Sequence, residues 1–436
     1  MGSYNIDEQH MLYKAHDAQV DASLDLPQTD IQILRELGKT YAEIAALPVQ
    51  QEKKTLWTKL NDLNPVRPLV WINEVCWEQM DVDGELTLTT QSEVARRLET
   101  LLRRTIYQWK HMPGDMVVDS VIYAPFIIDH PGIGIQVEAD FPAGATGEGI
   151  ISRHFANQIQ SEDDIAKITT PTIRHDAERS QAFLQAYREI FAGILDVQQK
   201  GSPGFWFSPW DDIVFWMGAD AALLNLAMEP DMMHRLITHV VDVYMNILDQ
   251  FEAQGLLGLN NCNWRVGSGA YGYTKDLPEK KAQQVNVCDI WGAAAPQIFG
   301  SVSPQMHKEF SIDVEKKYLN RFGLLYYGCC EPLSERLDLL ADLPNLRKIS
   351  ISPWANVARA AEGMRNKYVM SLKPSPSIFA SSGWDADYAR KELTSKLQEA
   401  KGCNVEIVMK DISTVLNEPH RLWEWAKIAN EVVQGL

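Results

Sequence analysis

The sequence has little of what marks several common classes of protein. It holds only six cysteines in 436 residues, far fewer than a disulfide-stabilised secreted scaffold needs. No apolar run approaches the roughly 18 residues of a transmembrane helix. The first ten residues, MGSYNIDEQH, also lack the basic-then-apolar order of a secretory signal. These absences predict a cytoplasmic protein with free thiols and no membrane partner.

Positive charge is also scarce. The chain has 41 Lys and Arg residues against 58 Asp and Glu residues, which gives a formal net charge of −17. Such an excess of acid repels phosphate backbones, so nucleic acid is not expected as a partner. No G-x-G-x-x-G or G-x-x-x-x-G-K-[ST] pattern follows an expected strand, which disfavours an open nucleotide-binding sheet. A small-molecule substrate is favoured instead.

What the sequence does contain is an alternation of short apolar runs with longer amphipathic segments. Residues 1–65 are expected to form an N-terminal helical extension, because Ile31, Leu34 and Leu37 recur every three or four residues. Nine strand-like runs follow, at 67–73, 116–123, 204–208, 256–261, 285–291, 322–328, 347–352, 368–372 and 404–410. Strands separated by helical crossovers pair in parallel. Their number and the chain length predict an α/β fold with a single (β/α)8 TIM-type barrel over residues 66–436.

Active sites of such barrels gather where strands end and loops begin. The most specific cluster there is Cys329, Cys330 and Glu331, directly after the run 322–328. Two thiolates and a carboxylate suit a zinc site with an open position, so these three residues are predicted to bind metal. The alternative is that the cysteines are packed thiols. A disulfide between adjacent cysteines would be strained.

Other side chains near strand ends are candidates for proton transfer and for substrate binding. Glu74, His130 and Asp411 are predicted to move protons or to orient the substrate. Aromatic rings near strand ends would line an apolar cup for a flat ligand. The predicted substrate-binding residues are Trp71, Trp206, Asn261, Trp264, Tyr327 and Lys373. Each aromatic residue among them also suits ordinary core packing.

Several stretches resemble the uroporphyrinogen decarboxylase superfamily of (β/α)8 barrels, and within it the corrinoid-dependent methyltransferases. These stretches are Gly218 to Pro230, Asp289-Ile290-Trp291-Gly292, Ser303 to Phe310 and Tyr327-Gly328-Cys329-Cys330, and the resemblance covers residues 65–436. The last of them stands where methyltransferase members carry H-x-C-G. The resemblance implies transfer of a methyl group between a small substrate and a corrinoid protein. It further implies zinc, cobalamin carried by the partner protein, and a homodimer.

The chain departs from this family at the zinc ligands. Of the three ligands only Cys329 is matched, because Tyr327 replaces the His and the last strand ends in Lys410-Asp411 without a Cys. The arginine-rich motif of the decarboxylase is also missing, so uroporphyrinogen is not an expected substrate. Two alternatives stay open. One is a metal-free decarboxylase or lyase that holds a small aromatic or carboxylated substrate through Lys373, Lys410 and Arg265, and the other is a non-catalytic binding barrel.

Overall fold

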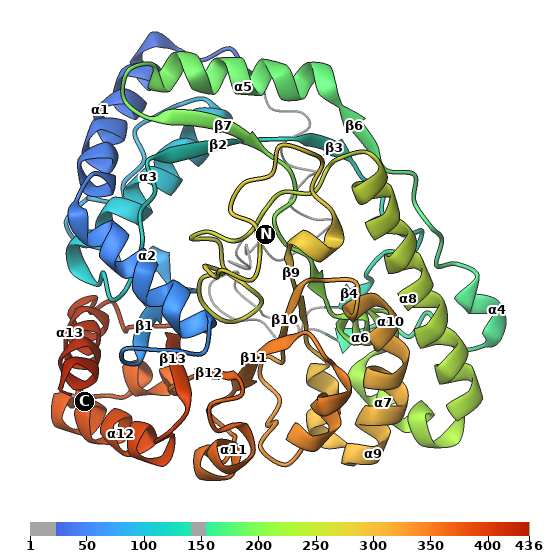
Figure 1. Cartoon of the computed structure of the whole chain (residues 1–436). Helices are drawn as coiled ribbons and strands as arrows, with labels where there is room; N and C mark the ends of the chain where they lie inside the picture. The colour runs from blue at the N-terminus through green and yellow to red at the C-terminus, as the bar shows by residue number, and fades with distance from the viewer. Residues whose placement is uncertain (1–22, 141–153, 436) are drawn as a thin grey trace.

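The computed structural model of the chain describes residues 23–140 and 154–435 (Figure 1). The strands are β1 (Leu69–Ile72), β2 (Val121–Pro125), β3 (Ile127–Asp129), β4 (Ala139–Asp140), β5 (His154–Phe155), β6 (Arg174–Asp176), β7 (Asp196–Lys200), β8 (Trp206–Phe207), β9 (Trp291–Ala294), β10 (Leu324–Tyr327), β11 (Leu346–Ile351), β12 (Val369–Leu372) and β13 (Asn404–Met409). The α-helices are α1 (Gln28–Ala45), α2 (Pro48–Asn61), α3 (Glu93–His111), α4 (Glu162–Ile165), α5 (Ala177–Phe191), α6 (Pro209–Met217), α7 (Ala219–Met228), α8 (Pro230–Ala253), α9 (Pro304–His307), α10 (Asp313–Leu319), α11 (Val357–Met364), α12 (Ala386–Glu399) and α13 (His420–Gln434).

Seven strands form one parallel sheet in the order β1-β13-β12-β11-β10-β9-β8. β2 and β7 form a separate parallel pair. Strands β9, β10, β12 and β13 are buried along their whole length, as parallel strands covered on both faces should be. Helices α8 to α13 lie along the outer side of the curved sheet (Figure 1). The predicted parallel α/β architecture is therefore confirmed.

Two links lead from the ends of this sheet to the β2–β7 pair. Only residues 201–205 separate β7 from β8. Beside β1, the Asp115 N–H donates to the Val70 carbonyl at 2.7 Å, in the segment that leads into β2. Strand pairing among the described residues nonetheless joins seven strands and two strands separately, so the closed eight-stranded ring stays a prediction.

Some predicted strands differ from the observed ones. The run 256–261 contains only an isolated bridge between Ser202 and Leu257. The run 285–291 ends where β9 begins, because residues 287–289 form a 3₁₀ turn that precedes the strand. Helix α1 covers the predicted N-terminal helix. Residues 1–22 lie outside the described part of the chain, and the domain boundary at residue 65 stays a prediction.

A short hairpin lies inside the curve of the sheet. It spans residues 265–271 and is called the interior hairpin below. An antiparallel bridge joins Arg265 to Tyr271, and the Val266 N–H donates to the Ala270 carbonyl at 2.9 Å. The chain between α8 and β9, which carries this hairpin, runs through the middle of the view in Figure 1, inside the curve of the strands.

The interior hairpin is anchored by a fully buried ion pair. Lys348 of β11 donates from Nζ to Glu406 of β13 at 2.8 Å and to the Tyr271 carbonyl at 2.9 Å. The other Glu406 oxygen accepts the Ala270 N–H at 3.2 Å. Buried charges need such partners, so the hairpin and the ion pair satisfy one another.

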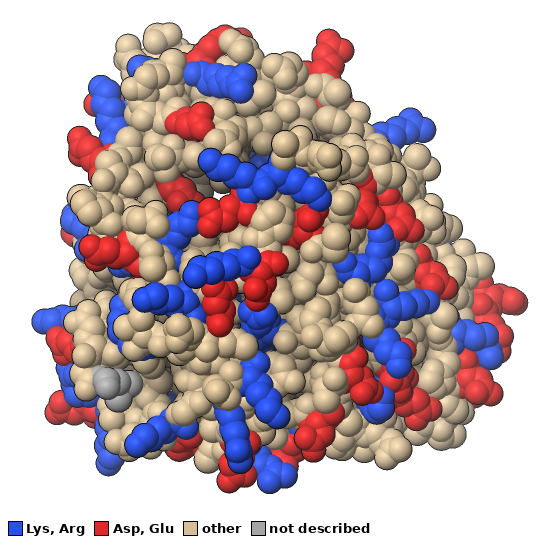
Figure 2. All heavy atoms as spheres, in the orientation of Figure 1, with Lys and Arg blue, Asp and Glu red and all other residues tan. Residues whose placement is uncertain are grey.

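The outer surface carries both signs of charge. On the face shown in Figure 2, Lys and Arg side chains are interspersed with Asp and Glu side chains. Within the described ranges, no helix combines the length and the apolar character needed to cross a bilayer.

Candidate functional site

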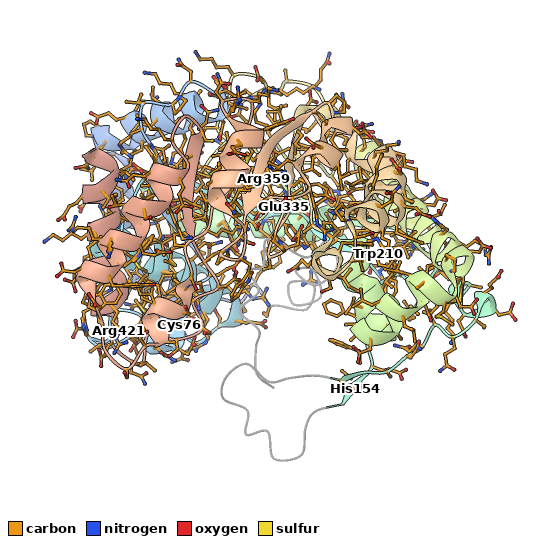
Figure 3. All side chains as sticks on the ribbon, turned by 90° about the horizontal axis from the view of Figure 1, so that it is seen from below. Cys76, His154, Trp210, Glu335, Arg359 and Arg421 are labelled. Atoms are coloured by element: carbon orange, nitrogen blue, oxygen red, sulfur yellow. The ribbon has the colours of Figure 1, made fainter. Side chains whose placement is uncertain are left out.

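Parallel strands bring the residues that follow them to one edge of the sheet. Figure 3 labels two residues that follow strands of the sheet, Cys76 after β1 and Trp210 after β8. Glu74, Lys373 and Lys410 follow β1, β12 and β13 in the same way. The structure brings Glu74, Cys329, Lys410 and Asp411 into contact, and these four residues are called the strand-end cluster below.

Cys329 is held in one position by its backbone. Its N–H donates to Glu331 Oε2 at 3.0 Å, and its carbonyl accepts from Ser350 Oγ at 2.7 Å and from Lys373 Nζ at 3.0 Å. The residue is only 6% exposed. Three hydrogen bonds thus fix the peptide that carries the thiol.

The Cys329 sulfur lies among polar groups. Its Sγ is 3.6 Å from Cys330 Sγ and 3.9 Å from Lys410 Nζ. The hydrogen bond from Cys330, together with the charges of Lys410 and Lys373, holds the pKa of Cys329 well below its usual value despite burial. The same hydrogen bond raises the pKa of the Cys330 thiol. Cys329 is therefore the thiolate of the pair.

Lys410 joins this thiolate to two carboxyl groups. Its Nζ lies 3.1 Å from Glu74 Oε2 and 2.9 Å from Asp411 Oδ2. Burial alone would lower the pKa of Lys410, but Cys329, Glu74 and Asp411 outweigh it and raise the pKa. Lys410 is consequently a permanent buried cation at the edge of the sheet.

Glu74 and Asp411 differ in protonation. Burial would raise the pKa of Glu74, but Arg265, whose Nη2 lies 2.6 Å from Glu74 Oε1, and Lys410 hold it well below its usual range. Burial and a hydrogen bond to Glu74 raise the pKa of Asp411 to about 6. One carboxyl is thus always charged, and its neighbour can hold a proton near neutral pH.

Both carboxyl residues have a left-handed backbone. Glu74 has a φ of 48° and Asp411 a φ of 57°, and the Ile412 N–H donates to the Glu74 carbonyl at 3.1 Å. Such conformations cost about 1–3 kcal/mol for non-glycine residues and concentrate at functional sites. The strain places the two carboxyls together beside Lys410.

Lys373 holds the interior hairpin against the strand ends. Its Nζ donates to Ser268 Oγ at 2.5 Å, to Ser350 Oγ at 2.7 Å and to the Cys329 carbonyl. These three neutral acceptors use the three N–H groups of the ammonium. Ser268 Oγ also lies 3.0 Å from the Gly328 carbonyl. The predicted substrate-binding lysine is therefore engaged with the protein itself.

Three carboxylic acids in this region have raised pKa values. Burial, with the nearby charge of Cys329, raises the pKa of Glu331 to about 8, and burial raises the pKa of Asp211 to about 7. Burial also raises the pKa of Glu315 to about 8. Glu331 Oε1 has no hydrogen-bond partner among the described residues. These groups can retain protons near neutral pH.

Other predicted site residues are engaged in packing or local hydrogen bonds. Tyr327 is fully buried and its hydroxyl lies 2.9 Å from His307 Nε2. His130 is buried, and its Nδ1 accepts the Gly132 N–H at 3.1 Å. Asn261 donates from Nδ2 to two backbone carbonyls of its own loop. Catalytic or binding roles for these residues stay predictions.

The three tryptophans that were predicted to line one apolar cup lie in different environments. Trp71 is buried and donates from Nε1 to the Tyr271 hydroxyl at 2.9 Å, beneath the interior hairpin. Trp206 packs against a small cluster that includes Tyr326. The Trp264 ring lies 5.7 Å from Lys200 Nζ. The structure therefore places these rings around the hairpin, and their contact with a substrate stays a prediction.

The predicted zinc ligands do not assemble into a three-ligand site. The two sulfurs lie side by side, but Glu331 turns one oxygen toward a backbone N–H and Lys410 places its ammonium next to Cys329. No group of three or more His, Cys, Asp or Glu side chains in the described ranges is placed to hold a metal ion, whereas catalytic zinc takes three protein ligands. Zinc stays an untested prediction, and the chemistry below is derived from the side chains alone.

Two residues of the cluster were missed in the sequence. Ser268 and Ser350 hold Lys373, yet neither follows an expected strand end. The glycines on both sides of Ser268 are a turn signal that could have located the hairpin. Nothing in the sequence places that turn next to β10.

Comparison with known proteins adds little to this geometry. No protein-family model matches the chain, and no curated protein matches its sequence. Among solved structures, a methyltransferase from Methanosarcina mazei is similar over 87% of this chain and 98% of that chain, with 11% sequence identity and a TM-score of 0.48. At this level the likeness assigns neither a fold nor an activity to the chain.

Proposed function

We propose that the chain is an enzyme that moves a methyl group from a small O-methyl or N-methyl substrate, with the strand-end cluster as its active site. The observation that carries the proposal is the convergence of Lys410, Cys329 and the Glu74–Asp411 carboxyl pair just after the ends of β1, β10 and β13. The segments that resemble corrinoid-dependent methyltransferases support the same reading.

A closed (β/α)8 barrel of the uroporphyrinogen decarboxylase type is part of this proposal. The short step from β7 to β8 and the hydrogen bond from Asp115 to Val70 support it, because together they lead from one end of the seven-stranded sheet to the other. A closed ring would give the cluster a single mouth at the carboxyl ends of the strands.

The side chains divide the work of methyl transfer. The methyl group leaves a heteroatom, so negative charge develops on that atom in the transition state. The Lys410 ammonium stabilises this charge, and Cys329 and Glu74 keep Lys410 protonated by their own charges. Asp411 gives its proton to the heteroatom, which departs neutral. A corrinoid carried by a partner protein would supply the nucleophile that takes the methyl group.

Methyl transfer to cob(I)alamin from a panel of O-, N- and S-methyl compounds tests the proposal by absorbance. Lys410→Met is expected to lower the rate at least about 100-fold, because fixed charges of this kind contribute roughly 10²–10³ in kcat. Cys329→Ser should also lower the rate, since the thiolate stabilises the charged form of Lys410. Cys403→Ser changes a half-buried thiol before β13 and should leave the rate unchanged. A wild-type rate in Lys410→Met would sink the proposal.

A second candidate is a metal-free decarboxylase or lyase. The observation that favours it is the set of three buried cations around Cys329 and Glu74, namely Arg265, Lys373 and Lys410, since cations bind carboxylates. Calorimetry with carboxylated aromatic acids and their uncharged methyl esters separates the two candidates. Tight binding of the acids with release of carbon dioxide, and no reaction with methylcobalamin, would favour the decarboxylase. Binding without any turnover would favour a non-catalytic barrel.

A further inference from the structure

Cys329 and Cys330 form an unusual pair of sulfurs. Side chains of adjacent residues in a strand point to opposite faces of the sheet. Here β10 ends at Tyr327, and Gly328 follows with a φ of 98°, a conformation that favours glycine. This turn brings the two neighbouring sulfurs to 3.6 Å from each other.

The two cysteines differ in solvent exposure and in the groups around them. Cys329 is buried and its peptide is fixed by three hydrogen bonds, whereas Cys330 is exposed. The Lys410 ammonium lies 3.9 Å from the Cys329 sulfur, and a cation next to a thiol favours the reactive thiolate. A buried sulfur on a fixed peptide therefore lies beside an exposed thiol.

We propose that Cys329 and Cys330 are a peroxide-reactive pair, in which a small peroxide oxidises Cys329 and Cys330 closes a disulfide between the adjacent residues. Four further cysteines complete the six, and each stands apart from the others: Cys76, Cys262, Cys288 and Cys403. The pair thus places a second thiol next to a sulfur that lies beside a lysine ammonium, and a resolving cysteine next to the reacting one is common in redox sensors. Peroxide reactivity of the pair does not rest on the proposed methyl transfer, in which Cys329 acts only through Lys410.

The chemistry balances in two steps. The Cys329 thiolate attacks one oxygen of hydrogen peroxide, the O–O bond breaks, and the hydroxide that leaves takes a proton from solvent to become water. Cys329 is then a sulfenic acid. The Cys330 sulfur attacks it, the S–O bond breaks, and hydroxide leaves with the thiol proton as a second water. The two sulfurs lose two electrons in all, and the peroxide gains them.

The product should be easy to reduce. Consecutive Cα atoms lie about 3.8 Å apart across a trans peptide, closer than the usual separation of roughly 4.4–6.8 Å in disulfides. Strained disulfides have more oxidising potentials and are the labile ones. A small dithiol should therefore restore both thiols.

Mass spectrometry tests the pair directly. The intact native protein is treated with one equivalent of hydrogen peroxide, blocked with iodoacetamide and cut by trypsin after Arg321 and Arg336, which isolates Cys329 and Cys330 from the other cysteines. The expected peptide has lost the mass of two hydrogen atoms and carries no alkyl group. Treatment with dithiothreitol after the peroxide and before the iodoacetamide should restore two free thiols, which are then alkylated.

Two variants make the result decisive. Cys330→Ser changes an exposed residue and should abolish the loss of two hydrogens, leaving a sulfenic acid on Cys329 that dimedone traps. Cys288→Ser, at another exposed cysteine, should leave the disulfide yield unchanged. Oxidation of Cys288 ahead of the pair, or alkylation of both Cys329 and Cys330 after peroxide, would overturn the proposal.

Discussion

Asp411 is the carboxyl in contact with Lys410 that can gain or lose a proton near neutral pH, since its pKa is about 6. It combines a left-handed backbone with contacts to Lys410 and Glu74. A carboxyl that is held in this way can give up a proton without first moving. Its neighbour Glu74 stays charged across the same range, because Arg265 and Lys410 hold the pKa of Glu74 low. The pair can therefore act as one proton donor and one fixed charge.

The first prediction concerns the pH dependence of activity. The proposed donor must be protonated and its pKa is about 6, so the rate of methyl transfer should fall as the pH rises through about 6. Asp411→Asn should remove this limb and lower the rate by about 10²–10⁴. Asp387→Asn, on the exposed face of α12, is the matched control and should keep both rate and pH profile. A wild-type profile in Asp411→Asn would refute the role of Asp411 as the proton donor.

For single residues, the sequence predicted which side chains follow strands better than it predicted their hydrogen-bond partners. Glu74, Asp411, Cys329 and Lys373 were located because polar residues after buried strands are easy to recognise. Their contacts were not predictable, since Lys373 is satisfied by Ser268 from a distant loop. Zinc was expected from residue types and from the family resemblance, and neither reveals that Lys410 lies next to the thiol.

At the scale of elements, the interior hairpin connects the core of the sheet with its functional edge. One end is tied to the Lys348–Glu406 ion pair, and its tip reaches Lys373 through Ser268. Its glycines allow close contact with Tyr326 of β10. A disturbance of the hairpin should therefore affect stability and the position of Lys373 together.

The second prediction follows from that close contact. A methyl group on Gly269 would lie 2.4 Å from Tyr326 Cε2 and 2.5 Å from Glu406 Oε1, which is too short for any real contact. Gly269→Ala should lower the free energy of unfolding by about 1–3 kcal/mol, the usual effect of overpacking. Urea denaturation measures the loss. Gly383→Ala has nothing within 4 Å of the added methyl and should change little, and equal stabilities of the two variants would contradict the packing described here.

Two strand predictions failed because the local composition of the sequence did not match the structure. β7 has the sequence Asp-Val-Gln-Gln-Lys, and its polar residues gave no apolar signal. The run 256–261 is apolar but makes only one bridge, to Ser202, because the chain turns away into the loop that carries the hairpin. Tertiary contacts decide both cases, and a local pattern does not contain them.

The whole molecule stores several protonated carboxylic acids in its interior. Burial raises the pKa of Asp211, Glu315 and Glu331 to about 7, 8 and 8 respectively. The folded state therefore binds more protons than the unfolded state between their ordinary and raised pKa values. The contribution of these three acids to the free energy of unfolding is fully present below their ordinary pKa values. It is lost as the pH rises toward the raised pKa values.

The third prediction isolates one of these acids. Glu315 is buried in α10 and titrates at 4.5 in an ordinary environment but at about 8 here. Glu315→Gln cannot ionise, so relative to the wild type it should gain stability on the order of 3 kcal/mol between pH 5 and pH 8. Urea denaturation at both pH values measures the gain. Glu335→Gln, at an exposed glutamate, should show no such gain, and an equal difference at both pH values for Glu315→Gln would refute the prediction.

For the whole chain, alternation of apolar runs with amphipathic helices was enough to predict a parallel α/β fold. The negative net charge argued against nucleic acid as a partner, and the few cysteines argued against a disulfide-stabilised scaffold. Closure of the predicted (β/α)8 ring stays a prediction, since it depends on how β1 and the segment at Asp115 meet. The hairpin was equally hidden, because a loop inside a sheet and a loop outside it can have the same composition.

The buried hairpin also constrains the order in which the chain can fold. Its partners come from α2, β10, β11 and β13, so Asn61, Tyr326, Lys348 and Glu406 all contact residues far away in sequence. Contacts of such long sequence separation slow folding, because large loops must close before any of them forms. Nascent chains released before β13 is made would lack Glu406 and leave Lys348 unpaired, which exposes them to the proteases and chaperones that sort incomplete folds.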